Sequence, residues 1–521
     1  MLVKTYAAAI RGIDALTVTV ESVVNHGLQF CIVGLPDASV KESQERVRAA
    51  ITQSGFKLPR LSVVINLSPA DVRKEGSAYD IPIAIALMVG AGLVQAPDLD
   101  KYMLIGELGL DGTLRPIKGA LPIAIEARAR GFKGLILPEA NATEAAVVNR
   151  LEVYGMNNLH DVADFLQGNS HPQPVIVDTR AEFASASNTF DFDFSDVKGQ
   201  ENVKRAFEVA VAGGHNILLI GPPGSGKSMM AKRLPSIMPP LTLGEALETT
   251  KIHSVAGKLA RGSRLMTVRP FRSPHHTISP VAMVGGGANP LPGEISLSHN
   301  GILFLDEFPE FPRTVLEVLR QPLEDRKISV SRARYQVEYP AGFMLVASMN
   351  PCPCGYYTHP TKRCTCPAGA VTRYMSRISG PLLDRIDIHV EIQPVEFEKL
   401  SDARKGESSE EIRQRVIKAR EIQSRRFAGE PNVHCNAQIN TRLQEKYCRL
   451  APDAMAILKR AMEKNDMSAR AYDRILKVAR TIADLDNSEN IEARHISEAV
   501  NYRTLDRSSW GNTGIQKGSL L

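Results

Sequence analysis

The sequence predicts an α/β protein with three domains, of which two are α/β and the third is helical. Short β-like runs alternate with runs of helical period in residues 1–168 and again in residues 191–395. In residues 396–505 the pattern changes, because apolar residues recur at i, i+4 and i+7, as on one face of a helix. The length of 521 residues supports this division, since it exceeds what one ordinary hydrophobic core holds.

The composition is that of a soluble globular protein. With 43% hydrophobic and 23% charged residues, the chain has neither the charge excess of a disordered protein nor a fibrous repeat. The net charge of +6 permits a nucleic-acid partner without indicating one. The first residues lack the apolar stretch of a secretion signal, and the longest apolar run, 81–94, is shorter than the roughly 20 residues that cross a bilayer. We therefore expect a cytoplasmic protein with a buried helix at 81–94.

Two segments of residues 1–190 carry local signals. The stretch GELGLDGTLRP, residues 106–116, has Asp-Gly between two extended runs, which predicts a hairpin whose two turn residues have positive φ. Residues 169–190 are rich in Pro, Ser and Ala without a sustained period, which predicts a linker.

A glycine-rich loop lies between an apolar strand and a helix-compatible run in NILLIGPPGSGKSMM, residues 216–230. This GxxxxGKS pattern is typical of a P-loop, whose backbone N–H groups surround the phosphates of ATP. Lys227 is expected to reach the β- and γ-phosphates, and Ser228 to hold Mg²⁺. The predicted nucleotide-binding residues are Gly221, Pro222, Pro223, Gly224, Ser225, Gly226, Lys227 and Ser228.

Downstream segments supply the groups that hydrolysis of ATP requires. The apolar run GILFL delivers Asp306 to Mg²⁺ and Glu307 to the attacking water. Asn350 ends the next apolar run, Arg385 follows a proline-opened turn, and Arg470 opens a helix of the third domain, from which it could touch the phosphates. Taken singly, these three residues are interpreted more simply as a capping Asn and two surface arginines. Their order after the P-loop favours an ATPase.

The order of these motifs resembles that of the AAA+ ATPases, and within them the magnesium-chelatase and MCM branch. Three segments, 269–287, 289–307 and 468–485, are similar to the family of bacterial magnesium-chelatase-like ATPases called ComM or YifB, and the likeness covers nearly the whole chain. The resemblance implies that Asn350 is sensor 1 and Arg470 is sensor 2 on a helical lid.

The resemblance also implies that Arg385 is an arginine finger. A finger acts in the site of a neighbouring subunit, so an oligomer is required. For the chain as a whole the resemblance implies a hexameric, ATP-driven DNA helicase that promotes branch migration of recombination intermediates during natural transformation.

Between Glu307 and Asn350, two β-like runs flank residues 331–334 and predict a hairpin that projects Lys327, Arg332 and Arg334. In the resembled branch a hairpin at this place lines the central pore and follows the DNA backbone, a contact independent of base sequence. The alternative is an exposed hairpin with solvated charges. Residues 284–301 resemble the helix-2 insert hairpin of the same branch.

Two further patterns suggest sites that we do not expect. The adjacent His275 and His276 would face opposite ways on an extended chain, so a two-histidine metal site is disfavoured. The N-terminal domain resembles the Lon protease domain and its S5-domain-2-like relatives, but the serine and lysine of a Lon-type dyad fall on Ala78 and Leu121. Proteolysis is therefore not expected.

Ser77 and Lys118 lie near those positions in the sequence, but neighbours on one element point elsewhere. A DNA-binding or ring-stabilising platform is the favoured role of this domain, with Arg73 and Lys74 as possible phosphate contacts. Residues 506–521 are expected to be a flexible tail.

Four cysteines crowd into NPCPCGYYTHPTKRCTCP, residues 350–367, with the spacing C-x-C-x₉-C-x-C. Four thiolates can bind structural Zn²⁺ tetrahedrally and order a loop that has no core of its own. Reduced thiols or a redox-sensitive cluster are the alternative, and a catalytic metal is disfavoured because four cysteine ligands leave no open position. The candidate ligands are Cys352, Cys354, Cys364 and Cys366.

Three function classes follow from the sequence. The leading one, which the resemblance implies, is a DNA motor that uses ATP and Mg²⁺ and works as a homo-hexamer on single-stranded, forked or branched DNA. The alternative is a chelatase-type ATPase that remodels a protein partner. A non-enzymatic, ATP-gated scaffold is disfavoured, because Glu307 and Arg385 are both present.

Overall fold

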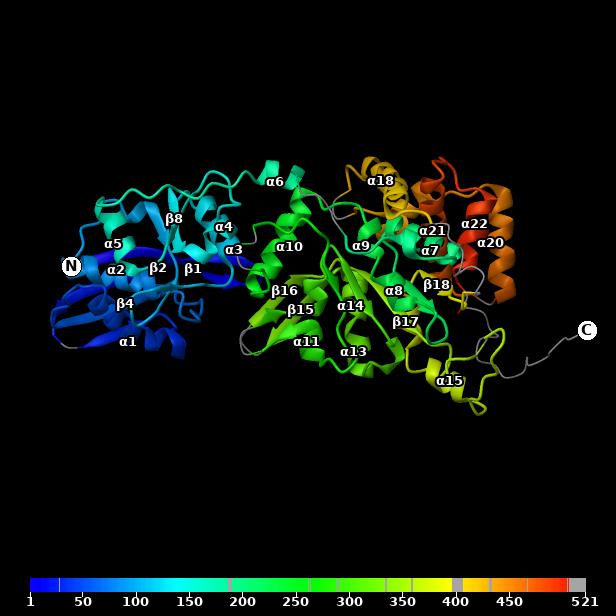
Figure 1. Cartoon of the computed structure of the whole chain (residues 1–521), viewed down its shortest axis with the longest axis horizontal. Coiled ribbons are helices and arrows are strands. Elements are labelled where there is room, and N and C mark those ends of the chain that lie inside the picture. Colours follow the sequence, from blue (N-terminus) through cyan, green and yellow to red (C-terminus); the bar gives the residue numbers. More distant parts are fainter. Residues whose placement is uncertain are drawn as a thin grey trace, which may run out of the picture.

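The computed structural model describes residues 1–27, 29–185, 190–260, 262, 264–287, 290–332, 335–357, 359–395, 406–430, 433–465, 467–503 and 505. Figure 1 shows an elongated arrangement in which the N-terminal domain, a central domain and a helical lid follow one another along the longest axis. The predicted tail, 506–521, lies outside the described residues, as do residues 396–405 at the start of the predicted lid. No helix in the described part of the chain is long and apolar enough to cross a membrane.

The N-terminal domain is built on a mixed seven-stranded sheet in the order β3-β4-β2-β1-β5-β8-β9. β1, β2 and β4 pair antiparallel, whereas β3 pairs parallel with β4 and the β1-β5-β8-β9 half is parallel. The strands are β1 Leu2–Arg11, β2 Asp14–His26, β3 Phe30–Val33, β4 Leu61–Ser68, β5 Tyr102–Leu104, β8 Gly134–Pro138 and β9 Glu152–Met156. The helices are α1 Ala38–Gln53, α2 Asp80–Gly90, α3 Ala120–Ala129, α4 Glu139–Ala145 and α5 Leu159–Gln167.

Two local predictions in this domain meet different outcomes. The apolar run at 81–94 contains most of α2, and all residues from Asp80 to Met88 are buried, so the buried helix is confirmed. The predicted hairpin is also confirmed, as β6 Glu107–Leu108 paired antiparallel with β7 Leu114–Arg115. The tight Asp-Gly turn is wrong, because five residues separate the strands and only Gly112 of the pair has a positive φ, +84°.

The segment that follows α5 packs on the N-terminal domain, which differs from the predicted linker. The amide of Val175 donates to the carbonyl of Val153 on β9 at 2.8 Å, and Val177 is buried in the domain core. The Thr179 hydroxyl donates to the carbonyl of Val147 at 2.9 Å, where α6 Thr179–Ser185 begins. The two valines supply apolar contacts that a count of Pro and Ser does not reveal.

The central domain has a five-stranded, wholly parallel sheet in the order β11-β14-β17-β10-β18. Because the strands are parallel, all their carboxyl ends meet at one edge and all their amino ends at the other. The strands are β10 Ile217–Ile220, β11 Phe271–Arg272, β14 Ile302–Leu305, β17 Met344–Met349 and β18 Ile388–Glu391. The helices are α7 Glu201–Gly213, α8 Lys227–Ala231, α9 Leu234–Ile237, α10 Leu243–Val255, α11 Pro280–Val284, α12 Glu294–Leu297, α13 Arg313–Val318, α14 Arg320–Asp325, α15 Ala370–Met375 and α16 Gly380–Leu383.

Two small antiparallel hairpins are inserted in this domain. β12 Gly285–Gly286 pairs with β13 Leu291–Pro292, and β15 Lys327–Arg332 pairs with β16 Tyr335–Pro340. Both predicted hairpins are therefore present.

The lid consists of α18 Ser409–Arg426, α19 Thr441–Tyr447, α20 Pro452–Asn465, α21 Ala469–Leu485 and α22 Ala493–Asn501. α18 begins with a capping box in which Ser408 and Glu411 satisfy each other's backbone N–H groups. Apolar residues of α18 and α21 pack in one core with α7 and the sheet, so the lid rests on the central domain.

The N-terminal domain contacts the central domain through α10. The Ser254 hydroxyl donates to Glu144 Oε1 at 2.5 Å, and the amide of Gly119 donates to the carbonyl of Ser254 at 3.2 Å. Figure 1 shows α10 beside α3 and α4 at this junction.

Candidate active site

The predicted phosphate loop lies between β10 and α8, at the carboxyl edge of the central sheet. Gly221 has no room for a side chain, because a Cβ there would lie 2.6 Å from the carbonyl oxygen of Ile392. Gly224 and Gly226 have φ values of +77° and +87°, which glycine adopts readily. The loop therefore depends on its glycines in the way that the sequence pattern predicts.

Lys227 extends under the loop. Its ammonium group donates to the carbonyls of Gly221 at 2.8 Å and Pro222 at 2.9 Å and to Asn350 Oδ1 at 3.2 Å. Burial lowers the pKa of Lys227, and the negative charges of Asp306 and Glu307 oppose that shift. The three donors of the ammonium group are thus held at the mouth of the loop, where a phosphate oxygen can exchange with a carbonyl.

Asp306 is the centre of a polar cluster at the end of β14. Its carboxylate accepts from the Ser228 hydroxyl at 2.5 Å, from the Ser348 hydroxyl, and from the amide of Glu307 at 3.1 Å. A serine hydroxyl beside a carboxylate is a suitable ligand pair for Mg²⁺, which prefers oxygen. Ser348 was missed in the sequence, although a serine two residues before Asn350 on an apolar strand points to the same face as Asn350.

Glu307 adopts an uncommon backbone conformation, with φ +54° at a non-glycine residue. Its carboxylate lies 3.3 Å from Nδ1 of His276, which comes from the chain between β11 and α11. The Glu307 side chain is 58% exposed, so a water molecule can reach it. His276 is a second residue that the sequence reasoning did not place in this site.

The two adjacent histidines do not face opposite ways. The rings of His275 and His276 lie 4.0 Å apart with an interplanar angle of 35°, because the chain turns after them rather than staying extended. The expectation that the side chains of His275 and His276 face opposite ways is therefore wrong. Among the described residues, the four clustered cysteines are the group of three or more Cys, His, Asp or Glu side chains that lie close enough together to hold one metal ion.

Arg385 lies at the opposite edge of the sheet from the phosphate loop. Its carbonyl accepts from Nδ2 of Asn216 at 3.0 Å, and Asn216 immediately precedes β10. The four residues of β10 separate this point from the loop, about 13 Å at the usual rise per residue. The guanidinium of Arg385 donates to the carbonyl of Pro381 at 2.6 Å and pairs with Glu324.

Arg470 does not extend toward the phosphate loop of its own chain. It pairs with Asp384 at 3.1 Å, so it lies beside Arg385, and its side chain is 64% exposed. The expectation that Arg470 touches the phosphates from the lid is therefore not met within one chain. The structure brings together Lys227, Ser228, Asp306, Glu307 and Asn350, and it groups Arg385 with Arg470 elsewhere.

Of the three predicted DNA contacts, Lys327 and the backbone of Arg332 lie among the described residues. Lys327 pairs with Pro340 at the base of the β15–β16 hairpin, and its ammonium lies 3.7 Å from Glu338. Arg332 is the last paired residue of β15, close to the tip, and Arg334 falls outside the described residues. Lys327 and Arg332 therefore lie at opposite ends of β15.

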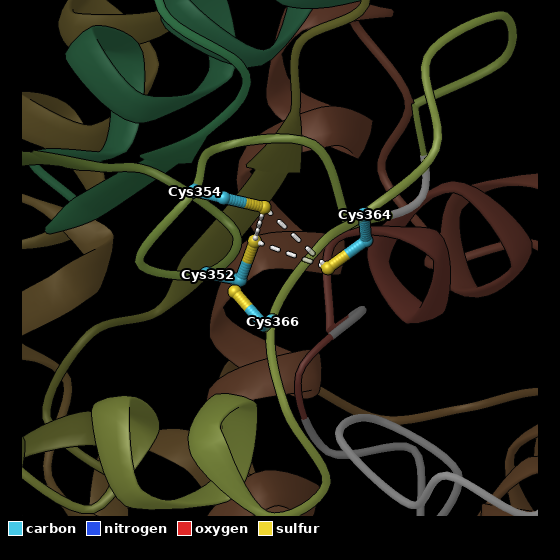
Figure 2. A group of neighbouring side chains, drawn as sticks. All are labelled: Cys352, Cys354, Cys364 and Cys366. Carbon is cyan, nitrogen blue, oxygen red and sulfur yellow. Dashed lines mark hydrogen bonds between the residues drawn. The ribbon is translucent and has the colours of Figure 1, made fainter.

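The four cysteine thiols converge between two turns of the 350–367 loop (Figure 2). The Sγ atoms of Cys352, Cys354 and Cys364 lie 3.3–3.8 Å apart, and those of all four cysteines lie within 4.8 Å of one another. Tetrahedral zinc with Zn–S bonds of about 2.3 Å would hold sulfurs about 3.8 Å apart. The sulfur positions therefore fit a tetrahedral zinc site.

Backbone amides support the thiols as ligands. The amide of Tyr357 donates to Cys352 Sγ at 3.3 Å. Burial raises the pKa of Cys354, but the amides of Tyr356 and Thr365 and the neighbouring thiols outweigh it and lower the pKa to about 6. Cys354 is therefore a thiolate at neutral pH, the form that binds zinc, whereas burial raises the pKa of Cys352, Cys364 and Cys366.

The cysteine loop also contacts the phosphate loop. At Gly355, whose φ is +83°, a Cβ would lie 2.5 Å from Cδ of Pro223. Only a glycine fits this approach, so the position of the phosphate loop depends on the shape of the cysteine loop.

The N-terminal domain shows no Ser-Lys pair at the positions of the Lon dyad. Ala78 and Leu121 occupy them, the Ser77 hydroxyl donates to Glu107, and the Lys118 side chain lies against Gly257 of the central domain. The suggestion that Lys74 meets phosphate is wrong, because Lys74 is fully buried and donates to the carbonyl of Pro69. Arg73 lies 3.4 Å from Glu75.

Three family models match the chain. The model described as "Magnesium chelatase, subunit ChlI" matches residues 193–400, "Subunit ChlI of Mg-chelatase" matches residues 20–141, and "Magnesium chelatase, subunit ChlI C-terminal" matches residues 406–503. They support an ATPase domain with a parallel sheet, flanked by an N-terminal α/β domain and a helical C-terminal domain.

Relatives match almost end to end. The uncharacterized protein YifB of Salmonella typhimurium is 45% identical over 509 residues, 97% of each chain. The competence protein ComM of Haemophilus influenzae is 42% identical over 511 residues, 97% of this chain and 98% of its own. The Lon protease 2 of Bacillus subtilis is 29% identical over 159 residues, 28% of this chain and 27% of its own.

Proposed function

We propose that this chain, which belongs to the YifB and ComM family of magnesium-chelatase-like AAA+ ATPases, is a hexameric DNA motor that drives branch migration of recombination intermediates. The observation that carries the proposal is the β15–β16 hairpin, inserted between Glu307 and Asn350 of the hydrolysis site. The hairpin is connected to Glu307 through α13 and α14 and to Asn350 through β17, so it moves when these groups respond to the γ-phosphate. The name of the competence protein ComM, a relative over nearly its whole length, supports a role in natural transformation.

Hydrolysis uses the groups at the carboxyl edge. Lys227 binds the β- and γ-phosphates, and Ser228 and Asp306 hold Mg²⁺, which neutralises developing charge on the phosphates. Asn350 orients a water molecule, and Glu307 accepts its proton as the water oxygen bonds to the γ-phosphorus. The bond from the γ-phosphorus to its bridging oxygen breaks, which leaves ADP and phosphate.

A second subunit completes the site. Because Arg385 lies at the amino edge of its own sheet, it serves the nucleotide of a neighbour, and Arg470 beside it serves the same neighbour. A head-to-tail contact of this kind forms a ring when its rotation closes, as the proposed hexamer requires. The N-terminal domain, with its S5-domain-2-like fold, stabilises that ring or adds a DNA contact, and the motor works in the cytoplasm.

The tip of the β15–β16 hairpin contacts the DNA backbone inside the ring. Arg332 and Arg334 provide the positive charge for phosphate contacts, which are weakened by salt and indifferent to base sequence. Lys327, at the base of the hairpin, contributes less than these two.

Zinc bound by Cys352, Cys354, Cys364 and Cys366 orders the loop that packs on Pro223. Its role is structural, because four cysteine ligands leave no open coordination position.

The test is purified full-length protein with ATP and Mg²⁺ on a four-way DNA junction, with strand displacement and ATP turnover measured together. We expect displacement that vanishes in Lys227→Ala and that weakens at higher salt. As a matched control, Lys258→Ala removes a lysine from the loop after α10, outside the site, and should leave displacement unchanged. ATP turnover that DNA does not alter, without displacement, would reject the DNA motor and favour a chelatase-type ATPase acting on a protein partner.

A further inference from the structure

The segment Asp384–His389, which we call the finger segment, is held by the lid at several points. Arg470 of α21 pairs with Asp384 at 3.1 Å, and Arg474 of α21 lies 3.0 Å from Asp387 Oδ1. After α22, the guanidinium of Arg503 donates to the carbonyl of Ile386 at 2.6 Å. The carbonyl of Tyr502 accepts from the amide of His389 at 2.7 Å. Lid groups therefore contact residues on both sides of Arg385.

Asp387 is the buried centre of these contacts. Its side chain is 1% exposed, and it lies between Arg474 of the lid and His215 at the end of α7, whose Nδ1 is 3.4 Å from Oδ2. His215 in turn shares a hydrogen bond of 2.8 Å with the Thr481 hydroxyl of α21. Because a buried carboxylate needs its cation, the lid and the finger segment are expected to move together.

Asn216 ties the same segment to the sheet. Its amide donates to Asp387 Oδ2 at 3.1 Å, and its side chain donates to the carbonyl of Arg385 and accepts from the amide of Leu345, which belongs to β17. Asp387 therefore touches the lid on one side and, through Asn216, the start of β10 on the other.

The chain that leads from β18 toward the lid passes beside the phosphate loop. Residues 391–394, which lead from β18 toward the lid, line a small hollow together with Gly221 and Pro222. The Gln200 side chain donates to the carbonyl of Gln393 at 2.5 Å. A conformational change at the nucleotide of one subunit can thus pass along the backbone into the lid. From the lid, the contacts of α21 transmit it to the finger segment.

We propose that Arg474 and Asp387 are positioning residues that couple the lid of one subunit to the arginine which that subunit presents to its neighbour. The inference rests on the proposed role of Arg385 in a neighbouring site. It adds that the nucleotide state of one subunit sets the hydrolysis rate of the next through this ion pair.

Mixed rings test the coupling. Subunits carrying Lys227→Ala, whose own sites do not turn over, are mixed one to one with wild-type subunits, and ATP hydrolysis per wild-type subunit is measured. A second change is then added to the Lys227→Ala subunits, namely Arg385→Ala, Arg474→Met or Arg474→Lys. The matched control is Arg415→Met, because Arg415 of α18 also pairs with the central domain, at Glu208, but does not touch the finger segment.

We expect Arg385→Ala to lower the rate to about half of the Lys227→Ala baseline, since half of the wild-type sites then face a variant neighbour. Arg474→Met should lower the rate toward the same value, Arg474→Lys should restore part of it, and Arg415→Met should leave it at the baseline. Ring size and thermal unfolding are recorded for every mixture.

Arg474→Met leaves Asp387 without its cation, so a folding defect is possible. The double change Asp387→Asn with Arg474→Met removes both charges and should lower the neighbour's rate without loss of the ring. One outcome would reject the coupling alone. In it, Arg385→Ala halves the rate, but the double variant and Arg474→Met both hydrolyse ATP at the rate of the Arg415→Met control. The proposed coupling would then be wrong, and the role of Arg385 as an arginine finger would remain supported. If Arg385→Ala itself stays at the baseline, the proposed function is wrong and the coupling falls with it.

Discussion

The two edges of the central sheet differ in what their polar groups contact. At the carboxyl edge, Lys227, Asp306 and Asn350 each follow one of three parallel strands. Lys227 contacts Asn350, and Asp306 contacts Ser228 and Ser348. At the amino edge, Asp387 and Asn216 are buried, and Arg385 and Arg470 pair with Glu324 and Asp384, two carboxylates of the central domain. The first edge has the groups that we propose to bind ATP, and the second has cations that lie away from the phosphate loop of the same chain.

This difference supports the proposal that one chain holds two halves of different sites. A parallel sheet places binding groups at its carboxyl edge, and its amino edge is free to serve another molecule. If the two halves belong to adjacent subunits, changes at the two edges must act on different subunits, which mixing experiments resolve.

The largest expected effect comes from the amino edge. Arg385→Ala should lower ATP hydrolysis by about 10³ to 10⁵-fold while ATP binding stays nearly unchanged, because the arginine stabilises charge that develops only in the transition state. Steady-state turnover and equilibrium ATP binding measure the two quantities. Arg377→Ala, which removes an arginine paired with Glu310 on the protein surface, is the control and should keep normal turnover. A loss of ATP binding in Arg385→Ala would place this arginine in its own subunit's site.

The second effect tests the division between subunits directly. Glu307→Gln should lower hydrolysis by about 10²- to 10³-fold in a uniform ring, since it removes a positioned group of the site. When Glu307→Gln and Arg385→Ala subunits are mixed one to one, about a quarter of the sites regain both groups, and turnover should recover to about that fraction of the wild-type rate. Mixtures that stay inactive would contradict a site shared between two chains.

A smaller effect is expected from the cysteine loop, which abuts the carboxyl edge at Pro223. Cys352→Ser with Cys364→Ser should lower bound zinc from about one per chain to none. Because the loop then loses its shape, we expect ATP binding to weaken about tenfold, equivalent to about 1.4 kcal/mol. Metal analysis and ATP titration check both.

The control for the metal experiment is Cys31→Ser, which changes an exposed cysteine of the N-terminal domain. It should alter neither quantity. Zinc that persists in the double variant would show that the four thiols are not the metal ligands, and a zinc-free wild-type protein with normal ATP binding would favour reduced thiols.

The carboxyl edge could be predicted from the sequence because Lys227, Asp306 and Asn350 each follow an apolar strand. Parallel strands bring such positions together whatever lies between them. The partners Ser348 and His276 were not predicted, because an ordinary serine or histidine becomes a site residue only through a neighbour that the fold supplies. The β15–β16 hairpin was predicted from period-2 alternation, which needs no distant contact, whereas the hairpin in residues 284–301 was predicted from the family resemblance.

The amino edge could not be predicted in this way. Asp387 and Arg474 are 87 residues apart, and the pair exists only because α21 packs across the end of β18. Likewise Lys74 reads as a surface cation in the sequence, yet the fold buries it against the carbonyl of Pro69. Burial of a charged residue depends on tertiary packing, which local pattern does not encode.

The smallest expected effect is a decrease in the free energy of unfolding at low pH, and it also arises at the amino edge. His215 and His389 are fully buried there, and burial lowers the pKa of both below the usual value for histidine. Above a pH of about 6.5 the folded and unfolded chains both hold these rings neutral, so no stability is lost. Below that pH the unfolded chain binds protons that the folded chain does not, and the free energy of unfolding falls by up to about 1.4 kcal/mol per pH unit for each ring.

His215→Gln tests this dependence, since it should reduce the slope of the unfolding free energy against pH, measured by urea unfolding between pH 6.5 and 5.5. A dependence on pH of the opposite sign would show that Asp387 controls the pKa of His215, because Asp387 lies 3.4 Å from Nδ1 of His215 and favours the protonated ring. If that attraction exceeded the effect of burial, the folded pKa would be raised, the wild type would lose stability as the pH rises, and His215→Gln would remove that loss. A slope that steepens toward acid in the wild type and flattens in His215→Gln therefore identifies the ring as neutral, with Arg474 left as the cation that Asp387 requires.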